Sequence, residues 1–200
     1  MPSSIHESAL IGSDTRYGEF CVIGENVRIG NDCAIGNHVV IHADTVVGDN
    51  VRIDDHAVLG KTPMRSSVTA IPQGKNLSPL RLSDRVLVGT GATLYRGAQI
   101  GTDCLVADYA SVREESTVGE YTIIGRGTVI ENRVTVGSRC KVETGVFISA
   151  YSCIGNDCFI APHVSATNDN YLGRTEERKK HFKGITIENG GRIGANALLL

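Results

Sequence analysis

An aliphatic residue recurs at every sixth position over most of this 200-residue chain, and this spacing limits the possible folds more than any other feature. The spacing holds through residues 5–59, 82–166 and 187–199, and among its 28 positions only Tyr17 and Ala166 are not aliphatic. A small residue usually stands two positions before the aliphatic one, so both side chains point to the same face of a short strand. An α-helix cannot bury such a series on one side, because its period is 3.6 residues.

Glycine often follows the aliphatic residue directly, and Asn or Asp is frequent just after the glycine. These residues tolerate the backbone of a sharp corner, so each hexad is predicted to be a short strand plus a corner. Hexad periods are typical of an all-β parallel β-helix, in which stacked coils bury a continuous core. With three hexads in a triangular coil, the chain is expected to form about nine coils, stacked over about 43 Å. The spacing leaves handedness open, although parallel crossovers are generally right-handed.

Two segments interrupt the repeat, residues 61–81 and 167–184, and both are predicted to be inserted loops. Fifteen hexads separate them, which is five whole coils, so both loops are expected to leave the same corner of the prism about 24 Å apart. The first loop has four Lys or Arg and no acid, and the second has five against three acids, although the net charge of the chain is -2. Positive loops on an acidic body favour binding of a phosphorylated small molecule, although ordinary solvated loops are the alternative.

Composition and charge define the broad class of the protein. A chain of this length suits a single domain over residues 1–200. The net charge does not predict binding to nucleic acid, and no apolar run is long enough to predict a membrane helix. The N-terminus lacks the charged and apolar regions of a signal peptide, so a cytoplasmic location is expected.

The six cysteines are predicted to be reduced and without a metal. There is no Cys-x-x-Cys pair, so neither zinc sites nor disulfides are expected. Cys153 is expected to face outward. The other five occupy the small inward position of the repeat: Cys21, Cys33, Cys104, Cys140 and Cys158.

Histidine is the natural proton acceptor near neutral pH, and His163 stands in an outward position just before the second loop. Asn168 and Asp169 follow at the corner where that loop begins. We therefore predict a site in which His163 is the general base, with His181 of the loop as its rival. A histidine that only decorates the surface is the plain alternative.

A polar column is expected beneath the same corner, one and two coils earlier. Asn132 and Tyr151 belong to it and are candidate acceptor-binding residues, together with Tyr171 and Arg174 of the second loop. His38 and His56 lie one coil apart at equivalent positions of the repeat, so their rings should stack outside the prism.

The run VIGENVRIGNDCAIGNHVVI resembles the left-handed parallel β-helix acyltransferases of bacteria and archaea, and the resemblance covers nearly the whole chain. The run FIAPHVSATNDNYLGR, followed by a loop and GITIENGGRIGANALLL, is similar to the branch that acetylates amines or hydroxyls of sugars, often nucleotide-linked ones. The resemblance implies a left-handed helix, a homotrimer, and acetyl-CoA bound in the groove between neighbouring subunits.

The resemblance also implies roles for particular residues. In several branches a histidine near this loop is the general base, whereas others carry an Asn-Asp pair, as Asn168 and Asp169 do here. The coil with Gly194 and Ala195 matches coils that contact the pantetheine arm of the coenzyme. The family usually continues with further coils, so a C-terminal cap is expected beyond residue 200.

These observations predict transfer of an acetyl group from acetyl-CoA to an amine or hydroxyl of a small, sugar-like acceptor. His163 or His181 would take the proton, Asn168 or a backbone N–H would stabilise the oxyanion, and Arg178 and Lys179 would hold phosphates. One alternative is a metal-dependent hydratase resembling carbonic anhydrase, which needs three histidine ligands. The other is a non-enzymatic β-helix that serves assembly or binding.

Overall fold

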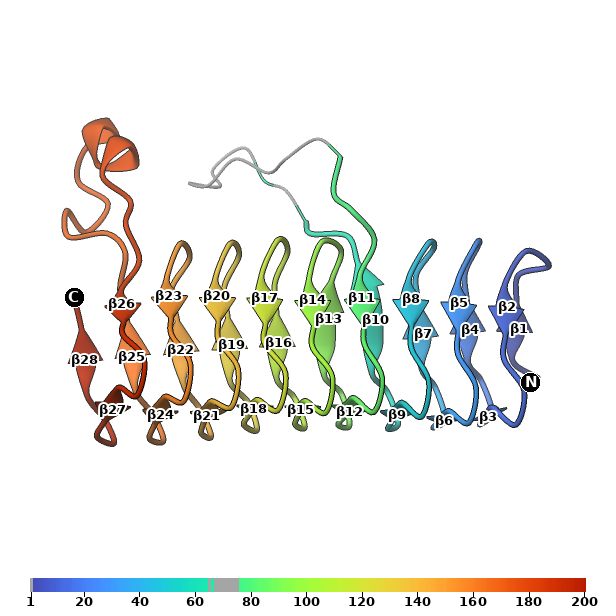
Figure 1. Ribbon diagram of the computed structural model, residues 1–200. Helices are drawn as coiled ribbons and strands as arrows, with labels where there is room; N and C mark the ends of the chain where they lie inside the picture. The colour runs from blue at the N-terminus through green and yellow to red at the C-terminus, as the bar shows by residue number, and fades with distance from the viewer. Residues whose placement is uncertain (1, 65, 67–75) are drawn as a thin grey trace.

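The computed structural model describes residues 2–64, 66 and 76–200, and within them the chain is a parallel β-helix (Figure 1). Its strands form three parallel sheets of ten, nine and nine strands, in which each strand pairs with the strands three before and three after it. The predicted all-β hexapeptide architecture, with about nine coils of three strands, is confirmed. Left-handedness stays a prediction.

The first sheet contains β1 (Ser4–Ile5), β4 (Val22–Ile23), β7 (Val40–Ile41), β10 (Val58–Lys61), β13 (Thr93–Tyr95), β16 (Ser111–Val112), β19 (Val129–Ile130), β22 (Phe147–Ile148), β25 (Ser165–Ala166) and β28 (Leu198–Leu199). The second sheet contains β2 (Leu10–Ile11), β5 (Arg28–Ile29), β8 (Val46–Val47), β11 (Arg81–Leu82), β14 (Gln99–Ile100), β17 (Thr117–Val118), β20 (Thr135–Val136), β23 (Cys153–Ile154) and β26 (Thr186–Ile187). The third sheet contains β3 (Arg16–Tyr17), β6 (Ala34–Ile35), β9 (Arg52–Ile53), β12 (Leu87–Val88), β15 (Leu105–Val106), β18 (Ile123–Ile124), β21 (Lys141–Val142), β24 (Phe159–Ile160) and β27 (Arg192–Ile193).

The second residue of nearly every strand points into the prism, where the inward side chains form one continuous hydrophobic core. The small residue two positions earlier also points inward. When it carries a hydroxyl or thiol, that group usually donates a hydrogen bond to a corner carbonyl of the next coil, as from Thr122 to Gly137 O at 2.9 Å and from Cys104 to Gly119 O at 3.0 Å. Thr45 and Ser152 instead donate to a carbonyl three residues earlier in their own coil. The slot therefore accepts Thr, Ser and Cys without leaving a buried polar group unpaired.

Two of the three edges of the prism carry a side-chain ladder that explains the Gly-Asn and Gly-Asp pairs. An Asn or Asp side chain accepts a hydrogen bond from the backbone N–H at the equivalent position one coil earlier, as Asp49 Oδ1 does from Asn31 N at 2.7 Å. The carboxylate lies so close to the glycine before that N–H that a Cβ on Gly30 would clash with Asp49 Oδ1. The Gly-Asn and Gly-Asp pairs of the sequence therefore mark places where adjacent coils pack closely.

The third edge lies between the first and second sheets, and we call it the loop edge. In its five coils from β13 to β25 the residue after the aliphatic one is never glycine. These five residues are Tyr95, Arg113, Glu131, Ser149 and Thr167. Because no ladder occupies this edge, its side chains are available for other contacts.

Both inserted loops leave this edge, as the hexad count predicts (Figure 1). The first follows β10 and the second follows β25, and five steps in the first sheet separate the two strands. Residues 65 and 67–75 of the first loop lie outside the described residues. The second loop contains the 3₁₀ helix η1 (Glu176–Lys180). Among the described residues no helix has the length and apolar character needed to cross a membrane.

The cysteines follow the predicted pattern, since five are buried, Cys153 is exposed, and none forms a disulfide. Burial raises the pKa of the Cys33, Cys104 and Cys140 thiols. We therefore expect a thiol reagent to modify Cys153 first in the native protein, because the thiolate is the reactive form. Titration after denaturation should count all six thiols. A denatured count of four or fewer would contradict this expectation.

Candidate functional site

His163 and the second loop lie at opposite ends of the same short strand. His163 occupies the turn between β24 and β25, with φ of 60°, and its ring packs over Gly145 one coil earlier. Asn168 and Asp169 occupy the turn after β25, on the loop edge. The expectation that His163 stands beside the polar column of its own chain is therefore wrong. It belongs to the edge between the third and first sheets, which we call the His163 edge.

The His163 edge also carries the predicted pantetheine segment. Gly194 and Ala195 follow β27, and the N–H of the next residue, Asn196, donates a hydrogen bond to Pro162 O at 3.1 Å. The structure thus brings His163 next to this coil rather than next to the second loop. Farther along the same edge the rings of His38 and His56 stack with centroids 4.9 Å apart, as predicted.

Asp169 organises the second loop. Its carboxylate accepts hydrogen bonds from Tyr171 N at 2.9 Å, Gly173 N at 3.1 Å and Arg178 Nη1 at 2.8 Å. Removal from water acts to raise the pKa of Asp169, but these bonds outweigh it and hold the pKa below its usual value. The guanidinium of Arg178 also lies over the ring of Phe182, 5.4 Å from its centroid. Both residues therefore shape the loop, and Arg178 reaches a ligand only with its remaining donors.

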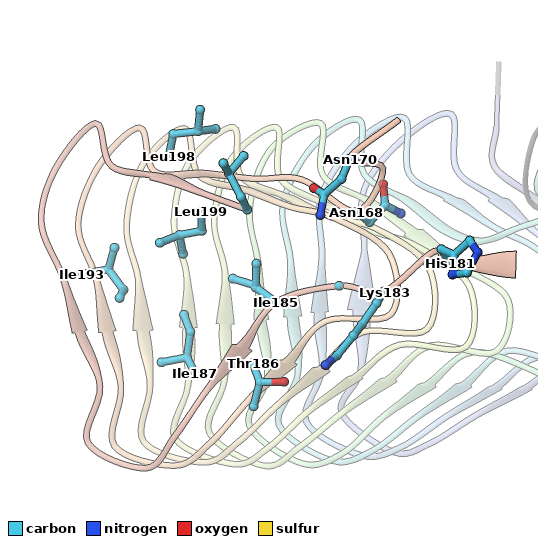
Figure 2. Close-up of a pocket in the computed structure, with 12 residues that line it drawn as sticks. Asn168, Asn170, His181, Lys183, Ile185, Thr186, Ile187, Ile193, Leu198 and Leu199 are labelled. Carbon is cyan, nitrogen blue, oxygen red and sulfur yellow. The ribbon is translucent and has the colours of Figure 1, made fainter. Parts of the chain in front are cut away.

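A cavity of about 770 Å³ opens between the second loop and the last coils (Figure 2). In this view His181 lies at one end, the apolar side chains lie at the other, and Asn168, Asn170 and Lys183 lie between them. The lining residues are Asn168, Asn170, His181, Lys183, Gly184, Ile185, Thr186, Ile187, Ile193, Leu198, Leu199 and Leu200. Ile187, Ile193 and Leu199 are inward residues of the repeat, so the apolar wall of this cavity is the core at the last coil, and its polar part is the group beneath the second loop.

The other loop residues predicted to bind ligands lie around this cavity or on its outer side. Tyr171 is exposed, and its ring is 5.7 Å from that of His181. Arg174 is exposed, and its backbone N–H donates to Tyr171 O at 3.1 Å. The side chain of Lys179 lies outside the described residues. Of the two candidate histidines, the structure thus places His181, and not His163, beside Asn168.

A second polar cluster lies on the loop edge between the two loops. Arg113 donates two hydrogen bonds to the Glu114 carboxylate, at 3.0 and 3.1 Å, and its Nη1 is 3.6 Å from Glu131 Oε2. The Arg113 guanidinium also lies over the ring of Tyr95, 5.2 Å from its centroid. Asn132 is only 5% exposed and lies one coil after Glu114 at the equivalent position.

Tyr151, the other predicted member of the column, lies one coil farther along. Arg133 donates a hydrogen bond to its hydroxyl at 3.3 Å and lies over its ring. The structure thus brings Asn132 and Tyr151 to one edge, as the sequence predicts. Arg113, Glu114 and Tyr95 are not among the residues predicted from the sequence, although the absence of glycine after β13, β16 and β19 is a signal for them.

No group of three or more His, Cys, Asp or Glu side chains in the described part of the chain is arranged to hold a metal ion.

Comparisons with known proteins agree with this architecture. The bacterial transferase hexapeptide (six repeats) family matches residues 2–43 and 26–61. No curated protein matches the chain significantly. Three solved structures show the same fold, and all are UDP-N-acetylglucosamine acyltransferases.

The enzyme from Bacteroides fragilis aligns with a TM-score of 0.73 and 20% identity, over 82% of this chain and 69% of its own. The Francisella novicida enzyme aligns with a TM-score of 0.74 and 24% identity, over 82% and 64%. The Campylobacter jejuni enzyme aligns with a TM-score of 0.59 and 20% identity, over 82% and 69%. The chain thus spans about two thirds of the length of these proteins. The comparisons thus identify hexapeptide repeats of the bacterial transferase type in residues 2–61, and over most of the chain they show the same fold as these acyltransferases.

Proposed function

We propose that this protein is an acyltransferase that moves an acetyl group from acetyl-CoA to an amine or hydroxyl of a sugar, free or nucleotide-linked. The observation that carries the proposal is the polar group beneath the second loop, where a histidine, two asparagines and a lysine line one cavity. Such a site can bind a polar acceptor at one end and exclude water at the other. The acyltransferase names of the proteins that share the fold support the reaction class.

The chemistry requires a proton acceptor and a stabiliser of negative charge. The acceptor group loses a proton as it attacks the thioester carbonyl, and His181 or His163 takes that proton. Asn168 or a corner backbone N–H donates to the oxyanion that forms. Gly194 and Ala195 hold the coenzyme arm, and Lys179 with the free donors of Arg178 holds phosphates.

The outer face of the first sheet favours a homotrimer. Its ten outward strand residues include no charged side chain, whereas the second sheet presents Arg28 and Arg81, and the third presents two further arginines beside Lys141 and Arg192. The ten residues are Ser4, Val22, Val40, Val58, Thr93, Ser111, Val129, Phe147, Ser165 and Leu198. Interfaces exclude charge from their centre, so this face is the natural contact between copies.

Such packing gives His163 a place in the site. The first sheet is bounded by the loop edge on one side and by the His163 edge on the other. When its face packs around a threefold axis, the loop edge of one subunit lies beside the His163 edge of the next. His163 of one subunit can then serve the polar column of its neighbour.

A charge on the proposed interface should therefore break the assembly. We expect Val129→Glu to convert the trimer to monomers at micromolar concentration, because a buried unpaired carboxylate is costly. Thr135→Glu, on the second sheet of the same coil, should leave the trimer intact. Light scattering of the three proteins is the measurement. A monomeric wild type would rule out both the trimer and the shared site.

The proposed reaction is tested by calorimetric titration with acetyl-CoA, followed by mass spectrometry of sugars and nucleotide sugars incubated with acetyl-CoA and the protein. Saturable acetyl-CoA binding and a mass gain of one acetyl group are the expected results. If acetyl-CoA does not bind at millimolar concentration, the proposal fails.

A further inference from the structure

The outer face of the first sheet does not by itself determine how far one copy slides along another. Eight of its ten outward side chains are Ser, Thr or Val, and its strands stack at one per coil (Figure 1). A copy displaced along the axis by one coil, about 4.8 Å, would therefore meet nearly the same surface. An interface built on this face needs a further feature that fixes its axial register.

Charged residues at the two ends of β16 and β19 provide such a feature. Each of these strands begins at a turn of the His163 edge and ends at a turn of the loop edge. The turns on either side of β19 contain Arg126 and Glu131, and those on either side of β16 contain Asp108 and Arg113. In both coils the two edges therefore carry opposite charges at the same height.

Arg126 and Glu131 both lack a hydrogen-bond partner in their own chain. Arg126 is exposed, and its guanidinium makes no hydrogen bond or ion pair to the described residues. Within that part of the chain the Glu131 carboxylate accepts no hydrogen bond, and its ion pair with Arg113 is as long as 3.6 Å. The Glu131 side chain is only 23% exposed, so a carboxylate without hydrogen bonds is costly there.

A threefold assembly brings these groups together. When the helix axes lie parallel to the symmetry axis, equivalent residues of the three copies lie at the same height. The His163 edge of one subunit then presents Arg126 to Glu131 of the next subunit, and Asp108 to Arg113. Because a strand separates the two members of each pair within one chain, each pair forms only between subunits.

Displacement by one coil would replace these attractions with repulsion. Arg113 and Glu131 occupy equivalent positions in adjacent coils, as do Asp108 and Arg126. A shift in one direction would place Asp108 opposite Glu131, and a shift in the other would place Arg126 opposite Arg113. Like charges that face each other across an interface disfavour that arrangement, so only the unshifted packing satisfies all four residues.

We infer that Arg126 of one subunit pairs with Glu131 of the next and fixes the axial register in which the copies pack. The inference rests on the proposed trimer and names the contact that aligns its subunits. Fixing register is the best-attested use of a charged or polar pair within an apolar interface.

This register also aligns the candidate site. His163 precedes β25 and Asn168 follows it, so the unshifted packing places His163 of one subunit at the height of Asn168 of the next. A shift of one coil would separate the two by about a further 4.8 Å along the axis, which is too far for both to contact one reacting group.

Sedimentation equilibrium of charge variants tests the pair. Arg126→Glu should weaken the trimer at least about tenfold, because it places two carboxylates opposite each other at all three interfaces. Glu131→Arg should weaken it in the same way, because it faces Arg126. Combining the two substitutions restores the attraction and should return the dissociation constant to within about a factor of three of the wild-type value.

Lys141→Glu is the matched control. Lys141 is exposed on the outer face of the third sheet, outside the proposed interface, and the substitution changes the net charge by the same amount as Arg126→Glu. It should leave the trimer unchanged. Circular dichroism of each variant checks that the fold is retained.

The outcomes separate this inference from the proposed function. An unchanged trimer in Arg126→Glu, or a double variant as weak as the two losses combined, overturns the pair and leaves the trimer and the acyl transfer standing. A loss of equal size with Lys141→Glu also overturns it. A monomeric wild type overturns the trimer and the pair together, whereas failure of acetyl-CoA to bind overturns the proposed reaction alone.

Discussion

Alanine at His163 is expected to lower acetyl transfer by roughly 10²–10⁴-fold, the usual contribution of a general base. His163 faces outward from the core, so the fold should be retained. The proposed trimer brings this side chain to the polar column of the neighbouring subunit. The measurement is the turnover number with saturating acetyl-CoA, taken together with the thermal midpoint of each variant.

His181→Ala is the competing substitution, because His181 lines the cavity with Asn168 inside a single chain. A large loss with His181→Ala and none with His163→Ala would place the base within one subunit. His38→Ala is the control, since His38 lies on the His163 edge six coils away and its ring stacks on those of Phe20 and His56. Unchanged turnover in both test variants would mean that neither histidine is the base, either because the chemistry lies elsewhere or because the acceptor arrives already deprotonated.

Ile124→Ala should lower the free energy of unfolding by about 2–5 kcal/mol, because it removes most of a fully buried side chain and leaves a cavity in the core. The β-helix makes this loss severe, since each inward residue packs against the coils before and after it and repacking one coil disturbs its neighbours. Denaturant unfolding of the purified protein is the measurement.

The adjacent residue provides the control, because Ile123 is the same amino acid on the same strand, β18, and points outward. Ile123→Ala should change the free energy of unfolding by less than about 1 kcal/mol. Equal effects of the two substitutions would contradict the assignment of inward and outward positions in the third sheet. A small effect of both would mean that the core tolerates a cavity.

The sequence by itself determined the fold, the inward and outward positions, and the common edge of the two loops. The six-residue period is compatible here only with a parallel β-helix, because one face of each two-residue strand must be buried in every coil. The inward Cys104 and the outward Cys153 follow from counting alone. The step of five coils between β10 and β25 also follows from counting, because every third hexad of an uninterrupted repeat returns to the same sheet.

Only the tertiary structure decided which candidate residues meet. His163 and Asn168 are five residues apart in sequence, yet a strand carries the chain from one edge of the prism to another between them. Conversely, Glu114 and Asn132 are 18 residues apart and lie in adjacent coils at the same corner. Asp169 organises the second loop because the loop folds back and brings Arg178 within 2.8 Å of its carboxylate, which the sequence does not predict. The repeat period defines where each residue lies on a coil. Contacts within the irregular loops depend on side-chain packing that does not repeat, so the period does not predict them.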